Sequence, residues 1–579
     1  MKSRIGVFVC HCGHNIASSV DVLGLADALR RHPDVAFAAD YKYMCSDPGQ
    51  QLIRQAIADH RLDGVVVAAC SPAMHETTFR RTADGAGVNP YRCECANIRE
   101  QVSWVHQHDQ TAATAKAGDI VRSIVERVRQ DECLEPLRLA LTRRCVVIGA
   151  GIAGMQAALD VAGAGYPVVL IERQSALGGR MAQLSGTYLN LEDGSDRLTR
   201  MIAAVERHAN IQVLTEAEVT VCSGYVGNFQ VEVRAGRPGG DEATPYTLDA
   251  GAIVVATGWD PYELSRLPEY GGGLLPDVVS TLEFERMLAP GGRLARPSDG
   301  VVPRQVVFIH CAGSRDPEHG VPYCSKTCCM VVAKQAMMFC QRVPEGQAYA
   351  FYIDLRTAGK GYEEYVRRSA EEHGVLYLRG KVSAVAAENG RLRVSGADTL
   401  SDLAVDIVAD LVVLATPMVP ADGAVPLGQT LHISTDADGF FNEAHPKLRP
   451  VETLTAGVYL AGTCQGPRDI PETLAQASGA AAKVLQLFSH EEMTQSPTVA
   501  AVVEDLCAAC ATCVGTCPYG ARTLHPVRAV AVVNPALCQG CGACVVACPN
   551  KACFVRNWRP TQVLAMLDQV GWSGDRRTG

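Results

Sequence analysis

The sequence predicts an α/β protein of several domains, in which a glycine-rich α/β region is interrupted by a second α/β region and followed by a cysteine-rich domain. Three observations support this fold class. Short apolar runs alternate with helical patterns, a glycine-rich turn follows one of those runs, and two similar groups of four cysteines stand near the C-terminus. The 579 residues correspond to about four domains at roughly 150 residues each.

Composition excludes several classes of protein. Hydrophobic residues make up 47% and charged residues 20%, which is typical of globular chains. The net charge of −9 argues against nucleic acid as a partner, because phosphate binding needs a cationic face. No run reaches the roughly 18 apolar residues of a membrane helix, and the apolar start indicates a strand and not a signal peptide. We therefore expect a soluble cytoplasmic protein with no transmembrane segment.

Residues 1–135 are expected to form a small parallel α/β domain. The strand-like runs 5–10 and 64–69 each lead into cysteine, and helical patterns at 51–59 and 111–129 alternate with them. Six cysteines of this domain have three open interpretations, namely a metal cluster, a thiol pocket or packing at strand ends: Cys10, Cys12, Cys45, Cys70, Cys93 and Cys95.

Residues 140–300 open with a dinucleotide-binding pattern. The buried strand 145–148 runs into Gly149-Ala150-Gly151-Ile152-Ala153-Gly154 and then into a helix. Such glycines permit a tight turn and a close approach of the backbone to a pyrophosphate at the helix N-terminus. Glu172 ends the next strand, where its carboxylate can accept from a ribose hydroxyl. The alternative is an ordinary glycine turn, but the strand, helix, second strand and acid together favour the dinucleotide-binding interpretation.

Three later segments favour FAD over NAD. They are residues 177–180, residues 253–258 and residues 458–462, which resemble the pyrophosphate, sheet and flavin-ring segments of two-dinucleotide-domain flavoproteins. The sequence therefore predicts a thioredoxin-reductase-like flavoprotein fold. The expected FAD-binding residues are Gly149, Gly151, Ala153, Gly154, Glu172, Arg173, Gly178, Gly179, Arg180, Ala256, Thr257, Gly258 and Gly462.

Residues 301–420 are predicted to form the second α/β domain, and residues 421–495 to return to the FAD-binding domain. Strands are expected at 306–310, 349–354, 375–378 and 411–415. The first of them leads into Cys311-Ala312-Gly313-Ser314-Arg315-Asp316 and not into a second glycine fingerprint, which argues against direct NAD(P)H binding. Residues 179–190 contain no cysteine, so no active disulfide is expected beside the flavin.

Residues 500–556 contain a duplicated run of four cysteines followed by proline, which predicts a 2[4Fe-4S] ferredoxin domain. The spacing C-x2-C-x2-C-x3-C-P places three thiolates around one cubane cluster and the fourth on the other cluster. Zinc sites also use Cys-x2-Cys pairs but do not need this duplicated pattern. The expected ligand sets are Cys507, Cys510, Cys513 with Cys548, and Cys538, Cys541, Cys544 with Cys517. In the tail, residues 557–579, an amphipathic helix at 560–570 either packs on its own chain or docks a partner.

Taken together, these motifs resemble the iron–sulfur flavoprotein subunit of heterodisulfide reductase, over residues 1 to about 556. The matching segments are residues 9–13, residues 70–76, the glycine fingerprint, residues 311–316, residues 323–329 and the ferredoxin domain. The resemblance implies a further [4Fe-4S] cluster on Cys311, Cys324, Cys328 and Cys329, for which packed thiols are the alternative. Lys334 would then lie near the flavin N5/O4 edge and tune its potential, or be a surface lysine. Members often carry an additional ferredoxin insert, which is missing between Gly227 and Ala252.

Three functions are consistent with these features. The first is an electron-transfer subunit of a heterodisulfide-reductase-like complex that converts two-electron flavin chemistry to one-electron cluster transfer, with flavin-based electron bifurcation as an extension. Its partners would be other subunits, a hydrogenase or dehydrogenase module and ferredoxin, in an oligomeric complex without nucleic acid. The alternatives are a self-contained NAD(P)H-dependent ferredoxin or disulfide reductase, and a non-catalytic iron–sulfur scaffold.

Overall fold

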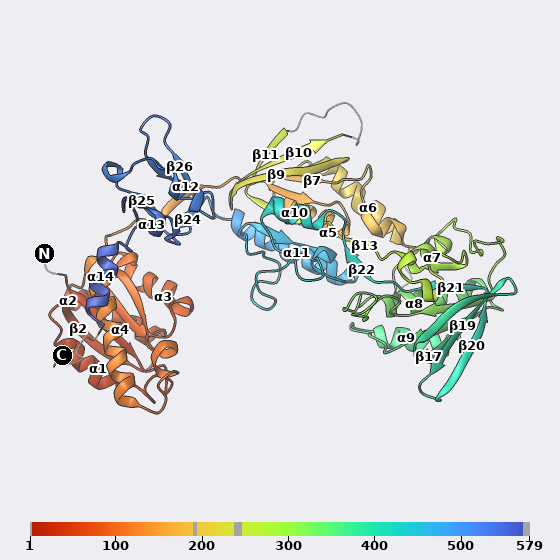
Figure 1. The fold of residues 1–579 in the computed structure, drawn as a ribbon, viewed down its shortest axis with the longest axis horizontal. Helices are drawn as coiled ribbons and strands as arrows, with labels where there is room; N and C mark the ends of the chain where they lie inside the picture. Colours follow the sequence, from red (N-terminus) through yellow and green to blue (C-terminus); the bar gives the residue numbers. More distant parts are fainter. Residues whose placement is uncertain (1–2, 189–193, 237–245, 571–579) are drawn as a thin grey trace. The chain divides into compact units, whose positions relative to one another are not determined.

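The computed structural model describes residues 3–188, 194–236 and 246–570. Outside the described residues lie the end of the predicted tail and residues 237–245, part of the segment where the ferredoxin insert is missing. The chain divides into two compact units, Met1–Leu139 with Thr494–Gly579 and Ala140–Met493, and each is described by itself (Figure 1). No helix in the described part of the chain combines the length and apolar character that a membrane crossing requires.

The N-terminal domain is built on a parallel sheet with strand order β2-β1-β3-β4. Its central strands are apolar and completely buried, as expected for strands covered on both faces. Helices α1 and α4 cover one face, and α2 and α3 cover the other (Figure 1). The elements are β1 (Ile5–Cys10), α1 (Val22–Arg30), β2 (Val35–Tyr41), α2 (Asp47–His60), β3 (Gly64–Ala69), α3 (Pro72–Asp84), β4 (Cys93–Asn97) and α4 (Gln110–Gln130).

The glycine-rich region forms a five-stranded parallel sheet of order β23-β12-β6-β7-β8. A three-stranded antiparallel sheet covers one face, and helices α5 and α11 pack on the other. The elements are β6 (Cys145–Ile148), α5 (Ile152–Gly163), β7 (Val168–Ile171), α6 (Gly194–Arg207), β8 (Ile211–Leu214), β9 (Ala217–Tyr225), β10 (Asn228–Ala235), β11 (Tyr246–Ala250), β12 (Ala252–Val255), α10 (Ala424–Leu431), β23 (Val458–Leu460) and α11 (Ile470–Phe488).

The second α/β region repeats this plan with the sheet order β14-β21-β15-β16-β17 and its own three-stranded antiparallel sheet. The short strands β13 (Trp259–Pro261) and β22 (Met418–Pro420) pair where the chain passes between the two regions. The other elements are β14 (Val278–Ser280), α7 (Thr281–Leu288), β15 (Gln305–Ile309), α8 (Cys328–Arg342), β16 (Gln347–Tyr352), α9 (Tyr362–Glu371), β17 (Leu376–Arg379), β18 (Val382–Glu388), β19 (Arg391–Asp398), β20 (Leu403–Ala409) and β21 (Leu411–Leu414).

The cysteine-rich domain consists of two similar halves, each with two short strands and a one-turn helix. Two antiparallel pairs join the halves, β25 with β28 and β26 with β27. The elements are β25 (Ala500–Val502), α12 (Thr512–Thr516), β26 (Arg522–Leu524), β27 (Ala531–Val533), α13 (Ala543–Ala547) and β28 (Cys553–Val555). The sheet orders agree with the α/β fold class predicted from the sequence, in which two α/β regions of the same plan are followed by a small cysteine-rich domain.

The predicted amphipathic helix of the tail is α14 (Pro560–Asp568), and it packs on α4 of the N-terminal domain. Met566 O accepts a hydrogen bond from Ser123 Oγ at 3.0 Å, and Gln562 Nε2 donates to Asp131 Oδ1 at 3.1 Å. The guanidinium of Arg127 lies 3.9 Å from the centre of the Trp558 ring. Of the two interpretations of this helix, packing on its own chain is therefore the one observed.

Candidate functional site

A cavity of about 520 Å³ lies at the carboxyl end of the glycine-rich sheet. Ligands of open α/β sheets bind at this edge. The glycine loop after β6, the segment 172–184 and the N-terminus of α11 line one side of the cavity. Helices α7 and α8 of the second α/β region line the other side, through Thr281, Glu285, Cys328 and Val331. The cavity is therefore shared by both halves of the flavoprotein fold.

The glycine loop is shaped for a close approach of the backbone to a ligand. Gly149 has a φ of +102°, and a Cβ there would lie 2.4 Å from Ala256 O. A Cβ at Gly154 would lie 1.8 Å from Gly149 O, so α5 packs directly on the loop. Gly151 differs, because a Cβ built on it meets nothing within 4 Å and would project into free space beside the helix N-terminus. That free space suits a pyrophosphate.

The carboxylate of Glu172 is buried at the same edge and lines the cavity. Its Oε2 accepts from the backbone N–H of Ala150 at 2.7 Å, and its Oε1 accepts from Gln174 N at 2.8 Å. Glu172 thus holds the glycine loop in place. Each oxygen keeps a second lone pair, so a ribose hydroxyl can still donate to it.

Most of the expected FAD-binding residues line the cavity, and three do not. Gly154, Gly178 and Gly462 lie behind its wall: Gly178 N donates to Ala150 O, and Gly462 N donates to Gln476 Oε1. Thr257 Oγ1 is buried at the wall with no hydrogen-bond partner, as is Arg468 Nε. Buried polar atoms are nearly always paired, so these two atoms indicate a polar ligand in the cavity. The residues present fit a dinucleotide cofactor.

Lys334 is not the surface lysine that was one of its two interpretations, and it is not among the residues that line the cavity. It is 2% exposed, its Nζ donates to Gly186 O at 2.8 Å, and it forms a 2.6 Å ion pair with Glu285 Oε1. Glu285 lines the cavity instead and also accepts from the backbone N–H of Ser185 at 2.8 Å. No sequence signal indicated Glu285, because it lies 49 residues from Lys334 on another helix.

Three of the four cysteines of the second region come together with a histidine. Ligand atoms of His310, Cys328 and Cys329 all lie within 4.8 Å of one another, and all three residues are buried. Hydrogen bonding among these thiols, with Cys328 as the shared neighbour, lowers the pKa of Cys329 and of Cys311 and raises that of Cys328. Thiolates of this kind bind iron.

The remaining members of this group are arranged differently. Cys324 Sγ accepts from Lys326 N at 3.2 Å, and within the described ranges no hydrogen bond joins it to the other three thiols. Both ring nitrogens of His310 are buried without a hydrogen-bond partner. His310 was not singled out in the sequence, although it directly precedes Cys311. Cys328 also lines the cavity of about 520 Å³, so this cysteine group borders that cavity.

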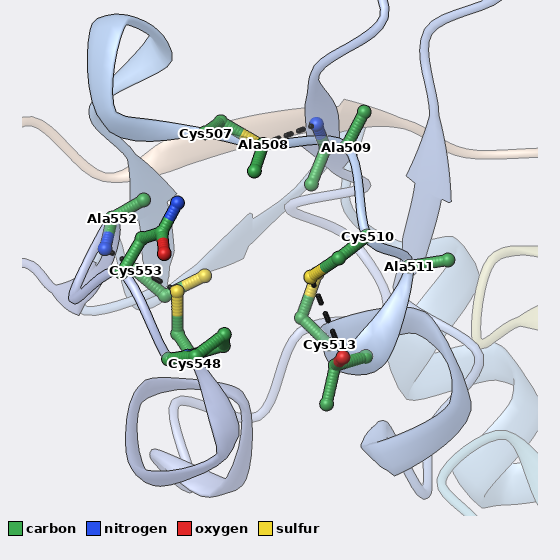
Figure 2. A pocket seen from close by; sticks show the side chains of 13 residues that line it. Cys507, Ala508, Ala509, Cys510, Ala511, Cys513, Cys548, Ala552 and Cys553 are labelled. Carbon is green, nitrogen blue, oxygen red and sulfur yellow. Dashed lines mark hydrogen bonds between the residues drawn. The ribbon is translucent and has the colours of Figure 1, made fainter.

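The cysteine-rich domain contains two small cavities lined by the two predicted quartets. Cys507, Cys510, Cys513 and Cys548 surround the first, together with Cys553 (Figure 2). The second is lined by Cys517, Cys538, Cys541 and Cys544, together with Arg522. Backbone N–H groups donate to sulfur at 3.3 Å in both, for example Ala531 N to Cys507 Sγ and Ala500 N to Cys538 Sγ. Such donors stabilise thiolate ligands, so both sites fit iron–sulfur clusters.

The N-terminal cysteines gather where β1 and β3 end, on either side of the point at which the strand order reverses. Burial raises the pKa of Cys10, and the neighbouring thiols Cys12 and Cys45 add to this rise. Arg99 Nη1 donates to Cys12 Sγ at 3.3 Å and is also close to Cys70. Cys93 and Cys95 lie on β4 within the apolar core. Four thiols and one guanidinium are therefore close neighbours at this edge of the sheet.

Comparison with known proteins agrees with this picture. Residues 143–295 match the family described as pyridine nucleotide-disulphide oxidoreductase, and residues 491–552 match the 4Fe-4S dicluster domain. The solved thioredoxin reductase of T. acidophilum is similar at 19% identity, with a TM-score of 0.40 over 60% of this chain and 99% of that chain. The family matches and the two kinds of site define an oxidoreductase that carries FAD and [4Fe-4S] clusters.

Two similar proteins identify the family more narrowly. The chain is 41% identical to a CoB--CoM heterodisulfide reductase iron-sulfur subunit of Methanopyrus kandleri, over 90% of this chain and 91% of that protein. It is 39% identical to the corresponding subunit of the H(2):CoB-CoM heterodisulfide,ferredoxin reductase of Methanothermobacter thermautotrophicus, over 90% of each chain. The chain belongs to the family of heterodisulfide reductase iron–sulfur flavoprotein subunits.

Proposed function

We propose that this protein is the electron-transfer subunit of a heterodisulfide-reductase-like complex, in which a two-electron carrier and one-electron carriers lie within one chain. FAD exchanges electrons in pairs, and [4Fe-4S] clusters exchange them singly. The observation that carries the proposal is the position of Cys328, which lines the cavity proposed for FAD and also belongs to the group with His310 and Cys329. The proposed FAD and the proposed [4Fe-4S] cluster would therefore both lie next to Cys328.

The protein's own residues have distinct tasks in this proposal. Gly149 and Gly151 open the loop to the pyrophosphate, Glu172 fixes that loop and accepts from the ribose, and Thr257 supplies a polar contact. Arg173, Gly179, Arg180, Ala256 and Gly258 line the rest of the cavity, and the proposal assigns the two ferredoxin clusters to the two cysteine quartets. A third cluster is assigned to Cys311, Cys324, Cys328 and Cys329.

Partners and acceptors come into the proposal from the relatives' names. One relative belongs to an H(2):CoB-CoM heterodisulfide,ferredoxin reductase and another to a Ferredoxin/F(420)H(2)-dependent CoB-CoM heterodisulfide reductase. We infer that this chain works with further subunits that carry a hydrogenase or dehydrogenase module and the disulfide site, with ferredoxin as one acceptor. None of the 24 cysteines forms a disulfide, which suits the reducing cytoplasm.

Metal and flavin analysis of anaerobically purified full-length protein tests the proposal. We expect about one FAD and about twelve iron atoms per chain, with matching acid-labile sulfide, because each cubane contains four irons. Cys328→Ser is expected to lose about four irons and keep its FAD, whereas Cys340→Ser, a change on the same helix outside this group, should lose none. Zinc without sulfide in the unmodified protein would overturn the proposal.

Electron bifurcation is a separate step and needs its own measurement. The complex should reduce ferredoxin with a given donor only when the disulfide acceptor is also present, since the two half-reactions are coupled. Ferredoxin reduction at the same rate without the disulfide would make the protein a simple relay. Rapid bleaching of the isolated chain's flavin by NADH would favour the self-contained reductase instead.

A further inference from the structure

A buried arginine stands between the two cysteine quartets of the ferredoxin domain. Arg522, the first residue of β26, is 3% exposed, and its Nη2 donates to Cys544 Sγ at 3.0 Å. Its Nη1 is also buried and has no hydrogen-bond partner. No ion pair between Arg522 and a carboxylate occurs in the part of the chain that the structure describes. The side chains that act on its charge are the thiols of Cys544, Cys553 and Cys513.

These thiols belong to both sites. Cys544 lines the second cavity, together with Arg522 itself. Cys513 and Cys553 line the first cavity, and Figure 2 shows Cys553 beside Cys548 and Cys513 beside Cys510. A single guanidinium thus faces both quartets, from a position closed to solvent.

Burying a cation without a countercharge costs several kcal/mol, and neutral thiols do not offset this cost. An arginine stays charged at any pH that the protein experiences. Its position is therefore understandable only if the surrounding sulfurs carry negative charge, as they do when they ligate a cluster. Because reduction adds one more negative charge to a cluster, a nearby cation stabilises the reduced form more than the oxidised form.

We propose that Arg522 raises the reduction potential of the cluster held by Cys538, Cys541, Cys544 and Cys517, and that it lowers the repulsion between the two clusters when each holds one electron. The domain can then accept two electrons in succession, one on each cluster. This inference rests on the proposed assignment of clusters to the two quartets. Arg522 acts through the cluster ligands, so it is a positioning residue and not a catalytic one.

A redox titration followed by electron paramagnetic resonance tests this inference on the full-length protein. In Arg522→Gln, the ratio of reduced to oxidised second cluster should fall at least tenfold at a given ambient potential, which equals about 59 mV for one electron. The magnetic interaction between two reduced clusters should also appear only at lower potential. Arg528→Gln is the matched control, because Arg528 belongs to the same domain but pairs with Glu504 at 51% exposure. It should change the ratio much less.

The outcomes are distinguishable. If the unmodified protein contains no iron and no acid-labile sulfide, the cluster assignment itself is contradicted. An Arg522→Gln protein that contains the normal iron and sulfide and titrates like the unmodified protein contradicts only the role of Arg522. Arg522→Lys keeps the charge without the planar fork and should recover part of the shift.

A measurement on the unmodified protein covers the case in which Arg522→Gln does not assemble its clusters. In protein labelled with ¹⁵N-arginine, electron–nuclear double resonance of the reduced clusters should reveal a coupled arginine nitrogen, because Nη2 lies against a ligand sulfur. Absence of this coupling would overturn the inference.

Discussion

Among single residues, two glycines of one loop have opposite structural roles. A Cβ at Gly154 would collide with Gly149 O, so this glycine allows the helix to pack on the loop. A Cβ at Gly151 would meet no protein atom and would enter the space proposed for the pyrophosphate. Both belong to the same sequence motif, and only the folded structure separates packing from ligand contact.

Gly151→Val should therefore abolish FAD binding while the protein stays folded. The valine side chain would fill the space proposed for the pyrophosphate, and its Cβ would not clash with the protein. Flavin content after purification and the thermal unfolding temperature measure the two effects. Gly154→Ala serves as the comparison and should instead destabilise the protein, because its Cβ lies 1.8 Å from a carbonyl oxygen. A Gly151→Val protein that still contains FAD would contradict the assignment of this space to the pyrophosphate.

The ion pair of Lys334 and Glu285 gives a second prediction about individual side chains. Removing one partner of a buried pair leaves an uncompensated charge, which costs about 3–5 kcal/mol. Lys334→Met should lower the free energy of unfolding by this amount in a denaturant titration. Lys326→Met removes one partner of a half-exposed pair with Glu472 and should cost no more than about 1 kcal/mol. Equal losses in the two variants would show that the Lys334 pair is not buried in solution.

Between helices, the docking of α14 on α4 depends on a carboxyl group with an unusual proton affinity. Burial raises the pKa of Asp131 to about 7, and its Oδ1 accepts from Gln562 of α14. The folded protein then holds this proton more tightly than the unfolded chain does. The resulting stabilisation is complete below about pH 4 and is lost as the pH rises toward 7.

Asp131→Asn should remove this part of the pH dependence, since the amide keeps an acceptor for Gln562 but does not titrate. The free energy of unfolding of the unmodified protein should fall relative to that of the variant between about pH 4 and pH 7. Asp84→Asn, at an exposed helix position, is the control and should run parallel to the unmodified protein. Parallel curves for Asp131→Asn as well would contradict the prediction.

Within the full chain, the folding of the ferredoxin domain should depend on its clusters. FAD binding by the unit Ala140–Met493 should not depend on iron. The apolar cluster of the ferredoxin domain has eight buried residues, of which four are cysteines. Such a small core does not stabilise a domain without a metal. Removing iron with a chelator under oxidising conditions should make residues 500–556 sensitive to protease and leave the FAD content unchanged. Loss of FAD together with the iron would contradict this separation.

The features that could be predicted from the sequence are those encoded by neighbouring residues. The features that could not be predicted depend on contacts between residues far apart in the chain. The strand, glycine loop and helix at 145–163 are contiguous, and the cysteine spacing is itself the ligand geometry, so both could be predicted. Glu285, His310 and Arg522 could not, because their roles arise from neighbours on other elements. Lys334 is a further example, because the sequence indicated its helix but not its ion pair with Glu285.

The docking of α14 on α4 also has a consequence for synthesis of the chain. The N-terminal sheet and α4 leave the ribosome early, but the helix that covers part of α4 is made more than 400 residues later. During this interval the nascent polypeptide exposes a surface that the finished molecule hides. Packing of the N-terminal domain is thus completed by a helix that is synthesised after both α/β regions.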